Sequence, residues 1–78
     1  MEKKFSELSL HQKLELIIKE LVDRDVQFKE AIREFEKIFI ETVAKRYNGN
    51  KVKMARAMGI HRNTLHSRAK ALKIKKLS

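Results

Sequence analysis

The stretch KVKMARAMGIHRNTLHSRAK, residues 51–70, predicts two short helices joined by a tight turn. Two helices that cross closely need a small residue where their backbones meet, and Ala55 supplies it. Four residues later, Gly59 can end the first helix because glycine adopts a positive φ without steric cost. Leu65, six residues further on, is expected to fill the angle between the helices, in a core with Met54. This pattern is typical of a helix-turn-helix.

Charge is distributed unevenly along the chain, whose formal net charge is +9. Residues 1–50 carry ten Lys or Arg and ten Asp or Glu, whereas residues 51–78 carry nine basic residues and no acidic one. A polyanionic partner that touches only one end of the protein explains this asymmetry. Nucleic acid is the commonest such partner, so we expect the last 28 residues to bind it.

The composition favours an all-α chain. Proline and cysteine are absent, and glycine occurs only at positions 49 and 59. A monomer of this size buries only about 60 to 65% of the surface that its unfolded chain exposes, so oligomerisation is expected to stabilise it. No apolar run approaches the roughly 18 residues of a membrane span, and the start MEKKF does not resemble a secretory signal. We therefore expect a single domain in the cytoplasm, associated with the nucleoid.

A first amphipathic helix is predicted after a flexible start at residues 1–8. Ser9 is its expected N-cap, and the helix runs to about Val22. Its apolar residues fall within roughly 100° of one another on a wheel of 3.6 residues per turn. They are Leu10, Leu14, Ile17, Ile18 and Leu21.

A second, longer helix is predicted from Val26 to about Tyr47, with Asp25 as its cap. Its apolar stripe consists of Phe28, Ala31, Ile32, Phe35, Ile38, Phe39 and Val43. Ile40 widens the stripe beyond what one neighbouring helix can cover. A symmetry mate would cover the rest, so residues 9–48 are predicted to form an intertwined four-helix dimer core, with extra contacts from Leu16 and Ile40. The alternative is that the stripe packs on the helix-turn-helix of the same chain.

The boundary before the helix-turn-helix is formed by Asn48, Gly49 and Asn50. The first two tolerate the left-handed conformations of a helix end, and Asn50 can cap the next helix. The predicted bounds are 51–58 and 62–72 for the last two helices, 50–72 for the helix-turn-helix and 73–78 for a basic tail.

A set of residues between positions 47 and 74 resembles the Fis-type DNA-binding module. The set is Gly49, Asn50, Ala55, Met58, Gly59, Ile60, Arg62, Asn63, Thr64, Leu65, Lys70, Leu72 and Ile74. Residues 35–47 fit the long helix of the module more loosely, and residues 1–30 resemble it only in layout. The resemblance implies a homodimer whose first two helices form the dimer core and whose last two helices read DNA.

The resemblance also implies roles for single residues. Asn50 and Thr64 would touch phosphates, and Arg62 would reach a base edge. Other positions expected to approach DNA are His61, His66, Ser67 and Arg68. Positions that depart from the family pattern are His61 in place of a Ser or Asn cap, Val52 in place of a small hydroxyl residue, Ala69 in place of Leu, and Lys73 in place of Gly.

A helical wheel predicts the DNA-facing surface independently of the family. With Leu65 at the centre of the buried side, the opposite side carries Asn63, His66, Ser67 and Lys70. Arg62 in the first turn can donate two hydrogen bonds to guanine, worth ~1 to 3 kcal/mol of discrimination. The alternative for Arg62 is a phosphate contact or a solvated side chain. Phosphate contacts or solvated positions are also expected for Lys51, Lys53, Arg56, Arg68, Lys70, Lys73, Lys75 and Lys76.

No enzyme is expected. His61 and His66 are five residues apart, but the basic third of the chain offers no Cys, Asp or Glu to complete a metal or catalytic site. We therefore expect no cofactor and no metal.

Three functions remain open from the sequence. The first is the DNA-binding domain of a sigma-54-dependent transcriptional activator, whose ATPase and receiver domains would lie upstream in the same protein. The second is a free-standing, Fis-like nucleoid protein that bends DNA. The third, from a different class, is a basic helical module that docks on an acidic protein or a membrane surface.

Overall fold

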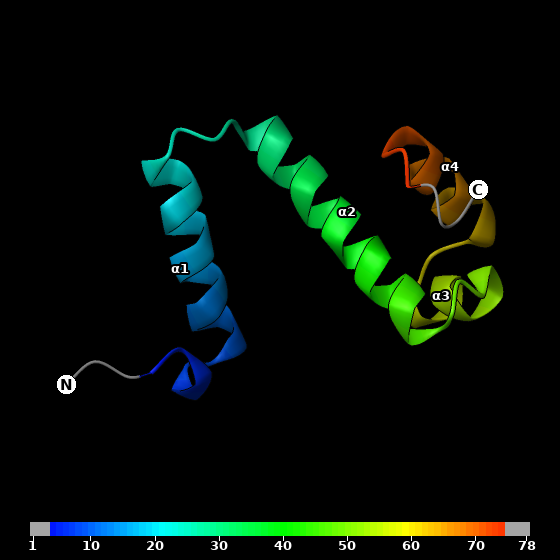
Figure 1. Ribbon diagram of the computed structural model, residues 1–78, viewed down its shortest axis with the longest axis horizontal. Helices are drawn as coiled ribbons and strands as arrows, with labels where there is room; N and C mark the ends of the chain where they lie inside the picture. The colour runs from blue at the N-terminus through cyan, green and yellow to red at the C-terminus, as the bar shows by residue number, and fades with distance from the viewer. Residues whose placement is uncertain (1–3, 75–78) are drawn as a thin grey trace. The chain divides into compact units, whose positions relative to one another are not determined.

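The computed structural model describes residues 4–74, and its regular elements are all helices. They are the 3-10 helix η1 (Phe5–Glu7) and the α-helices α1 (Leu10–Asp23), α2 (Phe28–Arg46), α3 (Lys51–Met58) and α4 (Arg62–Ala71) (Figure 1). The predicted all-α fold with four α-helices is confirmed for these residues. Lys75 and Lys76 of the predicted basic tail lie outside the described residues.

The chain divides after Ala31 into two compact units. The first holds η1, α1 and the first turn of α2, and the second holds the remainder of α2 with α3 and α4. Within residues 4–74, no helix has both the length and the apolar character that a membrane crossing requires.

Helix α1 begins at the predicted cap. The hydroxyl of Ser9 accepts a hydrogen bond from the Gln12 N–H at 3.1 Å, and the Gln12 side chain accepts one from the Ser9 N–H at 2.8 Å. This reciprocal pair is a capping box.

The end of α1 corrects the prediction for Asp25. This residue has a φ of +57°, and the following Val26 N–H donates to the Leu21 carbonyl at 3.0 Å. That is the bonding of a helix C-terminus closed by a left-handed residue. Asp25 therefore ends α1 and does not cap α2, which begins later than predicted, at Phe28.

Both units carry apolar side chains that their own residues do not cover. Helix α1 has no buried residue. Its exposed large apolar residues are Leu10, Leu14, Leu16, Ile17, Ile18 and Val22. On α2, the rings of Phe35 and Phe39 lie 5.8 Å apart between centroids, and the two residues are 58% and 45% exposed.

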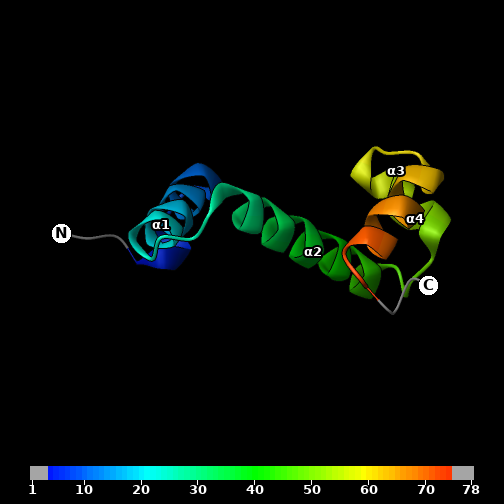
Figure 2. The same cartoon turned by 90° about the horizontal axis from the view of Figure 1, so that it is seen from above.

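The core of the second unit joins the C-terminal half of α2 to α3 and α4. The ribbon views show the backbones of these three helices at the same end of α2 (Figure 1, Figure 2). Its buried residues are Ile40, Ala44, Met54, Ala55, Leu65, Ala69, Leu72 and Ile74. Ile40 is only 1% exposed, so the prediction that it contacts a symmetry mate is wrong. The stripe of α2 is divided: its C-terminal half packs on the helix-turn-helix of the same chain, while Phe35 and Phe39 remain exposed.

The turn between α3 and α4 has the predicted geometry. Gly59 adopts a φ of +69° and ends α3, and the Ile60 N–H donates to the Ala55 carbonyl at 3.0 Å. Ala55 and Leu65 are both buried. The small residue, the left-handed glycine and the apolar plug therefore act as the sequence indicated.

Helix α4 ends at Ala71, and a left-handed residue follows it. Lys73 has a φ of +58°, and across it the Ile74 N–H donates to the Ala69 carbonyl at 2.9 Å. A lysine can hold this conformation, although at a cost of roughly 1 to 2 kcal/mol that a glycine would avoid. Ala69 is buried, so the shorter side chain still belongs to the core.

Candidate nucleic-acid interface

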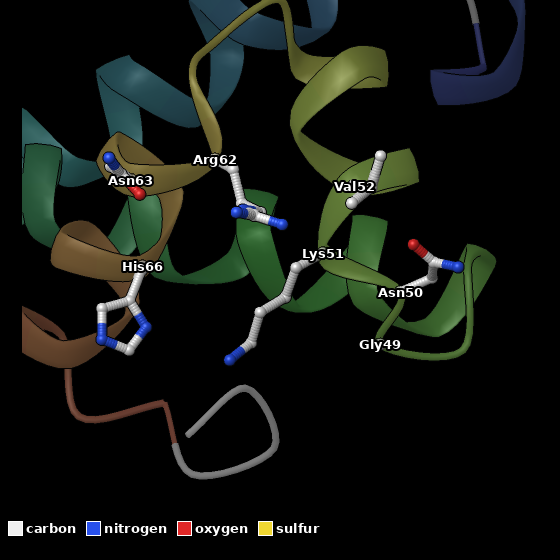
Figure 3. A pocket seen from close by; sticks show the side chains of 7 residues that line it. All are labelled: Gly49, Asn50, Lys51, Val52, Arg62, Asn63 and His66. Atoms are coloured by element: carbon white, nitrogen blue, oxygen red, sulfur yellow. The ribbon is translucent and has the colours of Figure 1, made fainter.

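A hollow of ≈ 550 Å³ lies between the N-terminal ends of α3 and α4 (Figure 3). Its lining residues are Gly49, Asn50, Lys51, Val52, Arg62, Asn63 and His66. The hollow thus combines the turn that precedes α3 with the first turns of both helices of the helix-turn-helix.

Two N-caps fix the helix ends between which the hollow lies. The side-chain oxygen of Asn50 accepts the Lys53 N–H at 3.1 Å and caps α3 as predicted. The Nδ1 atom of His61 accepts the Asn63 N–H at 3.1 Å and caps α4. Because only a neutral imidazole has an acceptor nitrogen, His61 caps with its proton on Nε2. His61 thus performs the capping role for which the family uses Ser or Asn.

The hollow is electropositive. Lys51 and Arg62 occupy the first positions of α3 and α4, and their side chains extend into it, with His66 at one side (Figure 3). Each helix N-terminus adds roughly half a positive charge, and none of the lining residues is acidic. Such a place attracts an anion of the size of a phosphate group.

The outer face of α4 is open to solvent. Leu65 and Ala69 are buried beneath it. The exposed residues on this face are Asn63, His66, Ser67 and Lys70, as the wheel predicted. This face is free to enter a DNA major groove, which is wide enough for an α-helix.

The hollow brings together five of the predicted site residues: Asn50, Lys51, Arg62, Asn63 and His66. The six that do not line it are Lys53, His61, Thr64, Ser67, Arg68 and Lys70, all of which are exposed. The sequence had not singled out Gly49 and Val52 as part of the site. They line the hollow because they flank the cap of α3.

A family model described as "Bacterial regulatory protein, Fis family" matches residues 31–72, more than half of the chain. The chain belongs to this family. Searches of curated proteins and of solved structures gave no match. The matched range includes α3, α4 and nearly all of α2, and therefore the whole hollow. This Fis-family helix-turn-helix is a DNA-binding unit, and its partner is double-stranded DNA.

One predicted DNA contact of the Fis-family unit is engaged within the protein. Arg68 Nη2 donates to Glu36 Oε1 at 2.6 Å, and Arg68 Nε donates to the other carboxylate oxygen. The hydrogen bonds from Arg68 hold the pKa of the Glu36 carboxyl below its ordinary value, and Glu36 raises the pKa of Arg68. Glu36 was not predicted from the sequence to lie at the site. The available signal was its place one helical turn before Ile40, on the side of α2 that packs on the helix-turn-helix.

Metal ligands do not gather in the described part of the chain. Within residues 4–74, no group of three or more His, Cys, Asp or Glu side chains is placed to hold a metal ion. His61 serves as a helix cap, and His66 lines the hollow.

Proposed function

We propose that the chain is a homodimeric, sequence-preferring DNA-binding domain, and that it belongs to a sigma-54-dependent transcriptional activator. The observation that carries the DNA-binding part is the hollow. It joins two helix N-termini and the side chains of Lys51 and Arg62 beside the exposed face of α4.

In this mechanism, the exposed face of α4 enters the major groove, and the hollow receives a backbone phosphate at the edge of that groove. Lys51 and the N–H groups of the first turns neutralise and orient the phosphate. Arg62 extends from the first turn of α4 to a guanine edge, where its two donors match the N7 and O6 acceptors. Phosphate contacts therefore fix the register, and Arg62 with the exposed face of α4 reads the sequence.

The test of base reading uses Arg62→Ala. A 30-base-pair duplex would be selected from a randomised library with the wild-type chain, and a scrambled duplex of equal composition would serve as the non-specific probe. Because Arg62→Ala removes one base contact from each protomer of the dimer, it should lower affinity for the selected duplex by about 30-fold or more and leave the scrambled duplex nearly unaffected. The control is Arg56→Ala, which removes an exposed arginine of α3 that does not line the hollow. Equal losses on both duplexes would assign Arg62 to phosphate binding.

Phosphate binding in the hollow predicts a change in salt dependence. Lys51→Gln should reduce the slope of log affinity against log salt by about 1.8 for a dimer, because one phosphate contact is lost in each protomer. An unchanged slope would remove Lys51 from the phosphate site.

Binding to anionic vesicles is the control for the membrane alternative. The large apolar residues Met54 and Leu65 are buried and not available to a bilayer.

The homodimer is supported by the apolar side chains that each unit leaves uncovered, above all on α1 and around Phe35 and Phe39. Sedimentation equilibrium should give twice the 9.2 kDa chain mass. Ile17→Glu, which places a charge on the exposed apolar face of α1, should shift the mass toward the monomer. Gln27→Glu adds the same charge at a polar exposed position and should not. A wild-type protein that remains monomeric at tens of micromolar would contradict the dimer.

The alternative is a free-standing, Fis-like protein of the nucleoid. An immunoblot of the native cell with an antibody against this chain separates the two. A band several times heavier than 9.2 kDa supports the activator, in which further domains belong to the same polypeptide. A band at 9.2 kDa supports the nucleoid protein.

A further inference from the structure

The pair formed by Glu36 and Arg68 connects two helices that are far apart in the sequence. Arg68 donates from Nε to one carboxylate oxygen of Glu36 and from Nη2 to the other, the latter at 2.6 Å. Two parallel bonds of this kind fix the plane of the guanidinium as well as its distance. The other ion pairs within residues 4–74 join residues four apart in or at the end of α1. Glu36–Arg68 is thus the one ionic link in the described chain between α2 and α4.

The other tertiary contacts of α4 are apolar. The helix is held by Leu65, Ala69 and Leu72, which are buried against α2 and α3. Apolar contacts have no preferred direction, and the middle one of these three is only a methyl group. They set the depth of α4 in the core. A directional contact at the side of the buried stripe can narrow the angle of α4 about its own axis further than apolar packing and the turn at Gly59 do.

Arg68 occupies such a side position. At 100° per residue, Arg68 lies about 60° from Leu65 on one flank of the buried stripe, and Arg62 lies about 60° from it on the other. Asn63 lies about 160° from Leu65, near the centre of the DNA-facing side, and both arginines lie about 120° from that centre. Arg62 is in the first turn, where its side chain can extend past the end of the helix, whereas Arg68 lies further along α4 and is bonded to Glu36. A rotation of α4 by about 20° would move its side-chain tips by about 2 Å, given a helix radius of about 5 Å with side chains. Hydrogen bonds to base edges tolerate only about 0.5 Å.

The charges of Glu36 and Arg68 also favour a role in positioning α4. Residues 51–78 hold no acidic side chain, so the acidic partner of Arg68 comes from the first 50 residues, and it is Glu36 of α2. An arginine that neutralises DNA phosphates would be weakened by a carboxylate beside it, because a neutral pair releases no counterions. The side chains of Arg68 and Glu36 remain 47% and 25% exposed, and partly exposed pairs contribute little to folding stability. Neither phosphate binding nor stability alone explains this arrangement.

We propose that Glu36 and Arg68 are positioning residues for DNA recognition, which fix the rotation of α4 and so aim Arg62 and the exposed face of α4 at the bases. This inference rests on the proposed sequence-preferring DNA binding. It assigns Arg68, one of the residues expected at the DNA, to the support of the reading helix.

The test compares four variants of the full chain on the selected and the scrambled duplexes described above. Glu36→Gln and Arg68→Gln should each lower affinity for the selected duplex by about tenfold, because a rotated α4 weakens its base contacts without abolishing them. Affinity for the scrambled duplex should not fall to the same extent. The exchange of the two charges, Glu36→Arg with Arg68→Glu, should restore most of the lost discrimination. The matched control is Glu34→Gln, which removes an exposed carboxylate from the same helix and should not change discrimination.

The salt dependence separates positioning from phosphate contact. If Arg68 positions α4, Arg68→Gln leaves the slope of log affinity against log salt unchanged. A slope reduced by about 1.8 for the dimer, with equal losses on both duplexes, would make Arg68 a phosphate contact and overturn the proposal. An exchange variant that has wild-type helicity by circular dichroism but discriminates no better than the single variants would also overturn it.

A conservative variant decides the question if the exchange variant does not fold. Arg68→Lys keeps the charge but has a single ammonium group, which cannot form the two parallel bonds. It should lose part of the discrimination at an unchanged salt slope, and full wild-type discrimination would overturn the proposal. A wild-type chain that selects no sequence would refute the proposed function and the positioning role together. A wild-type preference that every variant retains would refute the positioning role alone.

Discussion

Replacing His61 by Ala should destabilise the domain by about 0.5 to 1 kcal/mol. The His61 Nδ1 atom accepts the Asn63 N–H at 3.1 Å, and alanine offers no acceptor in its place. Loss of an N-cap costs about 0.5 to 2 kcal/mol. Both residues are exposed, so water partly satisfies the freed N–H and the lower half of this range applies. For a domain of this size, the melting temperature should fall by about 2 to 8 °C.

The assay is urea and thermal unfolding by circular dichroism at one fixed chain concentration, since a dimer's stability depends on concentration. His61→Asn keeps a side-chain acceptor and should match the wild type. His66→Ala removes an imidazole from the same helix without removing a cap and should change stability by less than about 0.5 kcal/mol. An equal loss of stability in His61→Asn and His61→Ala, or no loss in either, would show that His61 does not stabilise α4 as a cap.

Three further changes test the backbone and the ion pair. Gly59→Ala should cost about 1 kcal/mol in urea unfolding, since its φ is +69° and the added Cβ would meet no atom within 4 Å, which leaves backbone strain as the only cause. Lys73→Gly should do the opposite and raise stability by about 0.5 to 1 kcal/mol, because it relieves a φ of +58° while the larger entropy loss of glycine on folding offsets part of the gain; no gain would mean that this strain is absent in solution. The stability difference between the wild type and Glu36→Gln should shrink as the pH falls below about 4.5. The folded state holds Glu36 ionised with a lowered pKa, so the unfolded chain takes up the proton first, and a constant difference down to pH 3 would count against the ion pair.

The sequence was sufficient for the helix-turn-helix because local rules decide it. Ala55, Gly59 and Leu65 lie within eleven residues, and each is constrained by contacts or backbone angles of its near neighbours. The same holds for the caps at Ser9 and Asn50, where a side chain bonds to an amide three residues away.

The structure differs from the sequence-based predictions where two local rules compete or where the packing partner of a residue is distant in the sequence. Asp25 is suited both to a left-handed helix end and to an N-cap, and the structure uses it for the first. For Ile40, a helical wheel shows that its side of α2 is apolar, but it does not show which helix covers that side. The pair of Glu36 and Arg68 joins residues 32 apart, and only the packing of α4 on α2 brings them together.

Selection of preferred duplexes from a randomised library with the 78-residue chain tests the central claim most directly. Two α4 helices related by a two-fold axis must reach successive major grooves about 34 Å apart, so the enriched sequences should be inverted repeats with half-sites about one helical turn apart, each with a guanine for Arg62. A library that shows no enrichment, or enriches a single half-site without its inverted copy, would contradict a dimer that reads DNA through α4.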